Sequence, residues 1–274
     1  MSQVQVLSSA YEDTMKIIRK KKFTNGIVYA LETDDGYPVE VTDTFLPYYT
    51  KNAIGRKQNK LLSNDVGSRK ERWMIGVSVM SGCPVGCKFC ATAKLKKCRN
   101  LSSLEILDQI YFVLRNNNTL PSSCKEFKIN YTRMGEPFLN INEVKRTIAT
   151  INHIYPHSHH YISTIGIEGS DFSWIKDNIS LQFSIHSLRD SYRNWLIPYK
   201  RKMSIRNIGE IRTKSDLKTT LNMTLVNNED FDIKTMRKLF DPAYFFVKLS
   251  PINENTVSKE NRLGAGIIKA TNIV

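Results

Sequence analysis

Residues 73–90 read WMIGVSVMSGCPVGCKFC, an apolar run that leads into three cysteines spaced four and three residues apart. The run Trp73–Val79 has the length and composition of a buried strand. Gly82 and Gly86 supply the backbone freedom that a tight loop needs. Parallel α/β folds place their chemistry on loops at the carboxyl ends of strands, so this stretch predicts both a fold class and the position of a site.

Short apolar strands alternate with helix-period segments over the rest of the chain. Further strands are expected at Phe127–Tyr131, Tyr161–Thr164, Leu181–Ile185, Thr220–Leu225 and Tyr244–Leu249, and helices at Leu104–Arg115, Glu143–Ile154, Ser204–Thr213 and Ile233–Phe240. This alternation indicates parallel strands joined by crossover helices. Six such strands predict an α/β fold, a partial (β/α)6 TIM-like barrel, in a core domain over residues 71–274.

Residues 1–70 show a different pattern and predict a small basic α+β appendage with a linker. The expected elements are a helix-like basic segment at Tyr11–Lys22, hairpin strands at Gly26–Leu31 and Tyr37–Thr42, and a loop at Lys51–Lys70. The Asp34-Asp35-Gly36 turn between the two alternating stretches supports the hairpin.

The charge balance points to a polyanionic partner. Lys and Arg number 40 against 26 Asp and Glu, a formal net charge of +14, which favours RNA or DNA over acidic lipid; a merely solvated basic surface is the alternative. The apolar runs are strand-sized, so we expect no signal peptide, no membrane contact and a cytoplasmic location. Three of the five cysteines lie within eight residues, which favours metal in a reducing compartment over disulfides.

The three crowded cysteines fit an iron-sulfur cluster. Thiolates of Cys83, Cys87 and Cys90 can hold three corners of a [4Fe-4S] cube and leave one iron open. In radical enzymes that open iron binds S-adenosylmethionine, and reductive cleavage yields a 5′-deoxyadenosyl radical. The alternative is a structural zinc site, for which Cys98 and Cys124 are the nearest fourth ligands.

Further motifs follow the cysteines in order. They are Ala91-Thr92-Ala93, Arg99-Asn100-Leu101 with Glu105-Ile106, Met134–Asn140, Ile162–Thr164, Ser184–Ser187, Ile197-Pro198 with Lys200, and Pro251 with Asn253. With these motifs the region 72–253 resembles the RNA adenine methyltransferases of the RlmN and Cfr family, within the radical S-adenosylmethionine superfamily.

The resemblance implies a set of roles for individual residues. Gly135 and Glu136 would receive the methionine ammonium, Ser163, Ser184 and His186 would contact the ribose, adenine and carboxylate, and Asn253 would touch the adenosine. Glu40, in Val39-Glu40-Val41, is similar to a family glutamate placed near the substrate as a base, although an exposed strand glutamate is an equal reading. The resemblance also implies RNA as substrate and a reductant such as flavodoxin or ferredoxin.

Two cysteines of the family's methyl-transfer chemistry have no counterpart in the expected places. Gly76 stands near the position of the thiol that resolves a protein–RNA crosslink, and no cysteine follows Cys124 to carry a methyl group. Cys98, in a lysine-rich stretch, is the candidate catalytic substitute, with Cys124 a weaker one. The default reading for both is a small packing residue or an ordinary surface thiol. Three functions stay open: a radical enzyme that abstracts hydrogen from RNA or a nucleotide, an RNA adenine methyltransferase, and a non-catalytic RNA-binding module that keeps the cluster.

Overall fold

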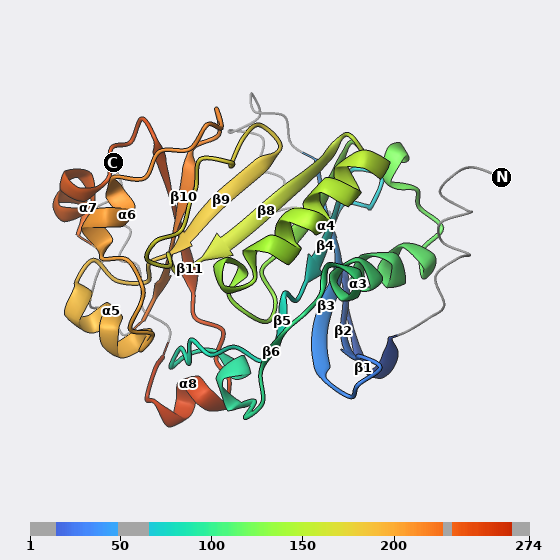
Figure 1. Ribbon diagram of the computed structural model, residues 1–274, viewed down its shortest axis with the longest axis horizontal. Coiled ribbons are helices and arrows are strands. Elements are labelled where there is room, and N and C mark those ends of the chain that lie inside the picture. The colour runs from blue at the N-terminus through green and yellow to red at the C-terminus, as the bar shows by residue number, and fades with distance from the viewer. Residues whose placement is uncertain (1–14, 49–65, 227–231, 265–274) are drawn as a thin grey trace. The chain divides into compact units, whose positions relative to one another are not determined.

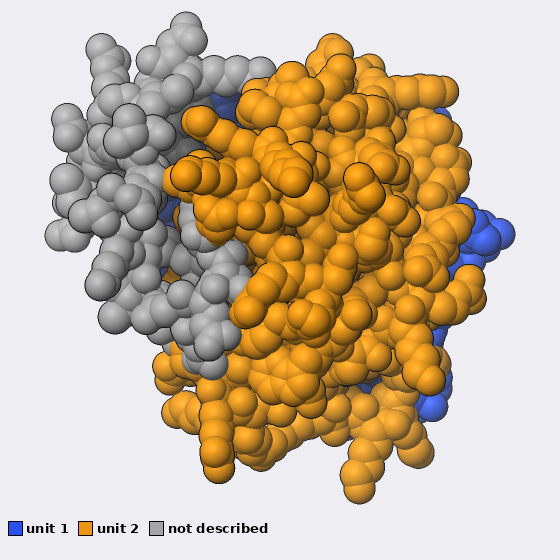
Figure 2. All heavy atoms as spheres, turned by 90° about the vertical axis from the view of Figure 1, so that its left-hand side faces the viewer, with its two compact units in different colours: residues 1–81, 100–134, 140–161 blue, residues 82–99, 135–139, 162–274 orange. Residues whose placement is uncertain are grey.

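The computed structural model describes residues 15–48, 66–226 and 232–264 (Figure 1). The chain divides into two compact units that interleave along the sequence (Figure 2). The first comprises residues 1–81, 100–134 and 140–161, and the second residues 82–99, 135–139 and 162–274. The domain boundary expected after residue 70 stays a prediction.

The first unit is built on a sheet. Its elements are strands β1 (Lys16–Phe23), β2 (Gly26–Glu32), β3 (Pro38–Leu46), β4 (Arg72–Val77), β5 (Met80–Ser81) and β7 (Glu126–Tyr131), helices α3 (Ser103–Arg115) and α4 (Ile141–Ile154), the 3-10 turn η3 (Pro121–Ser123), and most of β8 (Ser158–Thr164). Strands β1 to β4 pair antiparallel in succession, and β4 pairs parallel with β7. The predicted hairpin is confirmed, with Gly36 at φ +79° in its turn.

Amphipathic helices cover this sheet for local reasons. Helix α3 begins at a capping box. The Ser102 hydroxyl oxygen accepts from the Glu105 amide, and the Glu105 carboxylate accepts from the Ser102 amide. Its face with Ile106 and Ile110 is fully buried, as is Trp73 of β4. The Trp73 indole nitrogen donates to the buried Asp43 carboxylate at 2.8 Å, which satisfies both polar groups inside the core.

The basic N-terminal segment corrects one expectation. Residues 16–22 belong to strand β1 and not to a helix; Lys22 pairs with Ile27 and Phe23 with Gly26 across a tight connection. All eight residues of β1 are exposed, so burial of side chains does not hold this segment in place. Hydrogen bonding to β2 therefore decides its conformation. Residues 11–14, and residues 51–65 of the expected loop, lie outside the described residues.

The second unit holds parallel strands with crossover helices. Its elements are strands β9 (Ile179–Ser184), β10 (Thr219–Leu225) and β11 (Phe245–Pro251), helices α5 (Asp190–Leu196), α6 (Ile205–Gly209), α7 (Ile233–Leu239) and α8 (Thr256–Glu260), and the 3-10 turns η2 (Ala91–Lys94) and η4 (Pro137–Leu139). The short strand β6 (Arg99–Asn100) bounds the cysteine segment. Strand β10 pairs parallel with β9 on one side and β11 on the other.

Two features of the helices in this unit differ from the sequence expectation. Helix α6 ends at Gly209, short of the expected Thr213. A Cβ on Gly209 would lie 2.3 Å from the Leu239 carbonyl oxygen. Helices α5 and α8 had not been anticipated, because each is under two turns long and carries little periodic signal. Across the described ranges no helix has the length and apolarity to cross a membrane.

Candidate cluster and cosubstrate site

The cysteine loop owes its shape to two glycines. Gly82 has φ +74°, and a Cβ on it would lie 2.5 Å from the Lys97 carbonyl oxygen and 2.7 Å from the Cys98 Cβ. Gly86 has φ +69° in more open surroundings, so its backbone angle and not crowding requires glycine. The Cys90 amide donates to the Cys87 carbonyl at 3.1 Å, which closes the turn between the last two cysteines.

The three thiols share a half-buried and electrostatically coupled environment. Burial, together with negative charge on Glu136 and the neighbouring cysteines, raises the pKa of Cys83 to about 12 and that of Cys87 well above its ordinary value. The protein alone thus favours neutral thiols at Cys83 and Cys87, and bound iron would have to supply the charge that stabilises their thiolates. Among the described residues no three His, Cys, Asp or Glu side chains converge on a single ion. In a cubane each thiolate binds a different iron, and a trio of thiols on one loop fits that donor set.

Two short helices hold the cysteine loop in place. The Lys88 amide donates to the Leu196 carbonyl at the end of α5, at 2.9 Å. Asn255 and Asn261, at the two ends of α8, donate from their side chains to the carbonyls of Phe89 at 2.8 Å and Lys88 at 3.0 Å. Asn255 also caps α8 reciprocally with Ser258, a pattern from which this helix start could have been found in the sequence.

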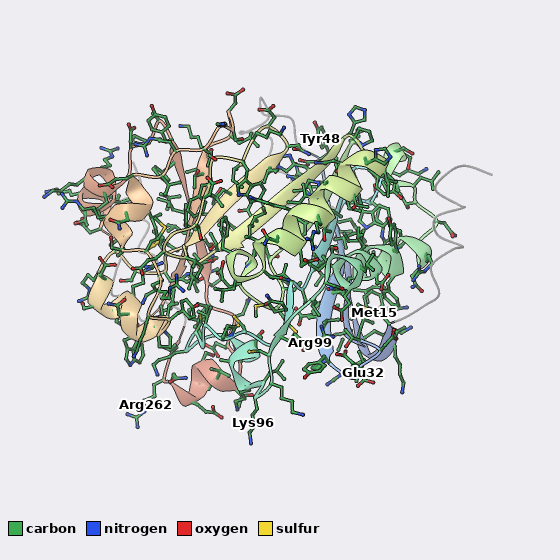
Figure 3. The ribbon with its side chains drawn as sticks, viewed as in Figure 1. Met15, Glu32, Tyr48, Lys96, Arg99 and Arg262 are labelled. Atoms are coloured by element: carbon green, nitrogen blue, oxygen red, sulfur yellow. The ribbon has the colours of Figure 1, made fainter. Side chains whose placement is uncertain are left out.

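Basic residues border the same part of the second unit. The Lys94 ammonium pairs with the Glu260 carboxylate at 2.7 Å, which brings η2 beside α8. Lys96 and Arg262, next to these two elements, project outward (Figure 3). Lys96 and Arg262 therefore place positive charge next to η2 and α8.

Glu136 is a buried carboxylate held by three donors. Its Oε1 accepts from the Thr164 hydroxyl at 2.5 Å and the Phe138 amide at 3.1 Å, and its Oε2 accepts from the Ile165 amide at 2.9 Å. Burial raises its pKa to about 7, because these hydrogen bonds offset only part of the desolvation. No Lys or Arg pairs with it within the described part of the chain. Gly135, just before it, takes φ +101°.

The serines and the histidine expected at the site lie at the ends of neighbouring strands. Ser163 Oγ and Ser184 Oγ are 3.1 Å apart, and the Gln182 amide donates to Ser163 Oγ at 2.9 Å. His186 is buried at φ +55°, and its Nδ1 accepts from the Thr224 amide at 3.0 Å. Burial, with a smaller contribution from Arg193, lowers the pKa of His186 to about 3, so the ring is neutral with its proton on Nε2.

Ring and backbone contacts bring these residues to the cysteine loop. The ring of Phe89 meets the ring of His186 edge-on, with centroids 4.8 Å apart. Asn253 lies exposed beyond β11, and its carbonyl accepts at 3.0 Å from the Asn255 side chain that also holds Phe89. The second unit thus contains the cysteines and the six residues expected to contact the cosubstrate.

Arg193 is a residue of this site that sequence reasoning missed. Its side chain is fully buried, and it donates to the carbonyls of Ile165 at 2.5 Å and Met203 at 2.7 Å. Burial lowers its pKa to about 10, against the attraction of Asp190 and Cys87. The Ile165 amide donates to Glu136 and the Ile165 carbonyl accepts from Arg193, so this one residue links Arg193 to that carboxylate. The only signal in the sequence is that Arg193 and Leu196 are three residues apart on one helix face.

The remaining candidates occupy ordinary positions. The side chain of Glu40, in the first unit, is 44% exposed and pairs with Arg133 at 3.3 Å. Cys98 is exposed and lies against Gly82, whereas Cys124 is half-buried and donates to the Leu120 carbonyl at 3.4 Å. A Cβ on Gly76 would lie 2.3 Å from the Thr42 hydroxyl, so the strand as folded leaves no space for a thiol there.

The fold is shared with a solved structure, that of a radical SAM methyltransferase from Sphaerobacter thermophilus. The TM-score is 0.67 at 21% sequence identity, over 93% of this chain and 71% of that one. The likeness confirms the α/β partial-barrel fold class that the strand–helix alternation predicted. The chain therefore shares its fold with that enzyme.

Sequence comparison finds similarity to RNA methyltransferases named RlmN. The chain is 31% identical over 221 residues to the dual-specificity RNA methyltransferase RlmN of Helicobacter hepaticus, and 30% identical over 201 residues to a probable RlmN of Thermotoga neapolitana. These alignments cover 77% and 68% of the chain, which spans 57% of the length of each relative. No family model matches. The resemblance to the RlmN family that the motifs predicted is confirmed.

Proposed function

We propose that the chain is a radical S-adenosylmethionine enzyme that acts on RNA. Cys83, Cys87 and Cys90 would hold a [4Fe-4S] cluster, which supplies the electron for reductive cleavage of S-adenosylmethionine. A reductant such as flavodoxin or ferredoxin would reload it. The support is the confirmed resemblance together with three half-buried thiols on one glycine-shaped loop.

The observation that carries the proposal is the burial of the Glu136 carboxylate. A buried carboxylate without a cationic partner is unfavourable, as its raised pKa shows, and the methionine ammonium of the cosubstrate is a cation that would complete it. Thr164, Ile165 and Phe138 fix the orientation of the carboxylate before any ligand arrives. Gly135, beside it, has φ +101°, a backbone conformation that favours glycine.

The other residues provide contacts for the rest of the cosubstrate. Ser163 and Ser184 form a hydroxyl pair suited to a ribose, and the buried Nε2–H of neutral His186 is suited to donate to an oxygen or ring nitrogen. Asn253, exposed at the end of β11, would contact the adenosine. A cluster-bearing module without catalysis would have no use for such a set.

The substrate is proposed from charge and from the relatives. The net charge of +14 attracts a polyanion, and the relatives named above are RNA methyltransferases. Their names favour methyl transfer to RNA as a second candidate, and adenine is the base that the motif resemblance implies. The Thr42 hydroxyl lies so close to Gly76 that a cysteine side chain, the resolving thiol of the family, would not fit there. The first candidate is therefore hydrogen abstraction from RNA without a methyl-cysteine step. Cys98, beside the cluster loop, is the thiol to test for a substitute role.

Anaerobic reconstitution tests the proposal. The wild type should bind about four irons and form 5′-deoxyadenosine from S-adenosylmethionine under a strong reductant. Cys87→Ala should lose both, and the matched control Cys124→Ala should keep both. Iron content that is unchanged in Cys87→Ala would refute the cluster assignment. Labelled methyl groups appearing in RNA would select the second candidate, and their dependence on Cys98 would show whether that thiol takes part.

A further inference from the structure

Helix α5 presents two stacked aromatic rings next to the site. The ring centroids of Tyr192 and Trp195 are 5.5 Å apart, with their planes at 29°, as residues three apart on one helix face permit. The helix buries Arg193 and Leu196, whereas Trp195 is 44% exposed. An exposed aromatic surface beside a binding site is a candidate contact surface.

Two cations flank the ring pair. The Arg189 guanidinium carbon lies 5.7 Å from the Tyr192 ring centroid, and the Lys88 ammonium lies 5.5 Å from the Trp195 ring centroid. Aromatic rings with cations at their faces match the chemistry of single-stranded nucleic acid, whose bases stack on the rings and whose phosphates attract the cations. Charge complementarity thus selects a polyanion with exposed bases over an apolar partner.

The location of the pair links it to the chemistry. Lys88 lies between Cys87 and Cys90, and its amide is bonded to the carbonyl at the end of α5. Arg189 follows His186 by three residues, beyond the carboxyl end of β9. A second aromatic–cation pair, Arg212 over Tyr244 at 4.1 Å, lies at the amino end of β11, the end opposite Asn253.

We propose that Tyr192 and Trp195, with Arg189 and Lys88, form a stacking platform for an unpaired base of RNA beside the nucleotide that reacts. The proposal rests on the proposed function, since it takes RNA as the substrate. A base stacked on Trp195 would hold the strand in register with the cysteine loop. Paired RNA buries its base faces within the helix, so the platform favours loops, bulges and single strands.

Binding to a labelled single strand of about 12 nucleotides, measured by anisotropy with the reconstituted protein, tests the platform. Trp195→Ala should weaken binding about 10-fold, the effect of losing one base–aromatic stack, and Trp195→Phe should retain most of the affinity. Tyr244→Ala, which removes a similar exposed ring at the other strand end, is the matched control and should bind as the wild type does. Cluster absorbance and RNA-independent 5′-deoxyadenosine formation should stay unchanged in Trp195→Ala.

Salt dependence separates stacking from charge. Arg189→Gln should lower the slope of log affinity against log salt by about 0.7, the value for one phosphate contact in a single strand. Trp195→Ala should lower affinity at every salt concentration and leave the slope as it is. If Trp195→Ala changed the slope but not the affinity, a stacking role would be contradicted.

Three results would overturn the platform while leaving the proposed function intact: wild-type affinity in Trp195→Ala, an equal loss in Tyr244→Ala, or equally tight and Trp195-dependent binding of a duplex of the same sequence. Wild-type protein that forms 5′-deoxyadenosine but has no affinity for RNA would refute both the platform and the RNA substrate. It would leave the radical chemistry standing.

Discussion

Replacing Glu136 by Gln should remove a pH dependence of folding that the wild type shows. The carboxyl of Glu136 has its pKa raised from the ordinary 4.5 to about 7, so the folded state keeps a proton that the unfolded state has released between these values. Stability from this group is therefore full below pH 4.5 and is lost as pH rises through about 7. A separation of about 2.5 pH units at about 1.36 kcal/mol each gives a loss of about 3 kcal/mol.

Urea unfolding of the cluster-free protein at several pH values between 5 and 8 measures this term. The difference in free energy of unfolding, wild type minus Glu136→Gln, should fall by about 2.5 kcal/mol over that range, since the rest of the loss falls below pH 5. Glu168→Gln, at an exposed loop position, is the control and should follow the wild type. Saturating S-adenosylmethionine should flatten the difference, because a cation beside Glu136 lowers its pKa.

A difference between wild type and Glu136→Gln that stays constant from pH 5 to 8 would refute the reasoning. It would mean that the three donors hold Glu136 ionised throughout this range, despite burial. A flat profile in the free protein would also remove the main support for Glu136 as a vacant acceptor for an ammonium. A pH-dependent difference that S-adenosylmethionine leaves unaltered would confirm the burial effect and contradict the ammonium contact.

Other predictions concern packing and the buried arginine. Arg193→Met should lower the free energy of unfolding by about 2–5 kcal/mol, because two buried carbonyls lose their donor, and Arg193→Lys should recover part of it in the same urea titration. Gly76→Cys should destabilise by about 1–3 kcal/mol through contact with the Thr42 hydroxyl, and adding Thr42→Ala should relieve it; additive effects in this double-mutant cycle would contradict the contact. Gly82→Ala should prevent iron binding by displacing the loop from Cys98, and iron content equal to the wild type would disprove that constraint.

Much of the candidate site could be predicted because it is local in the chain. The spacing of Cys83, Cys87 and Cys90 requires no knowledge of the fold, and strand periodicity placed Glu136 and His186 beyond strand ends. The bonds of Arg193 to Ile165, 28 residues away, and of Asn255 to Phe89, 166 residues away, join segments that carry no shared pattern. Pattern reasoning has no signal for contacts of this kind.

The sequence by itself determined that an α/β chain would carry three closely spaced thiols after a buried strand, since hydrophobic period and cysteine spacing are properties of short segments. Tertiary structure alone decided that residues 16–22 form a strand, because pairing with β2 outweighs a weak local helix pattern. It also decided that Glu136 is buried with no cationic partner among the described residues, that Arg193 is buried against the Ile165 and Met203 carbonyls, and that Trp195 stands exposed beside the cysteine loop. Burial and long-range pairing set pKa values and surfaces, and both exist only in the folded chain.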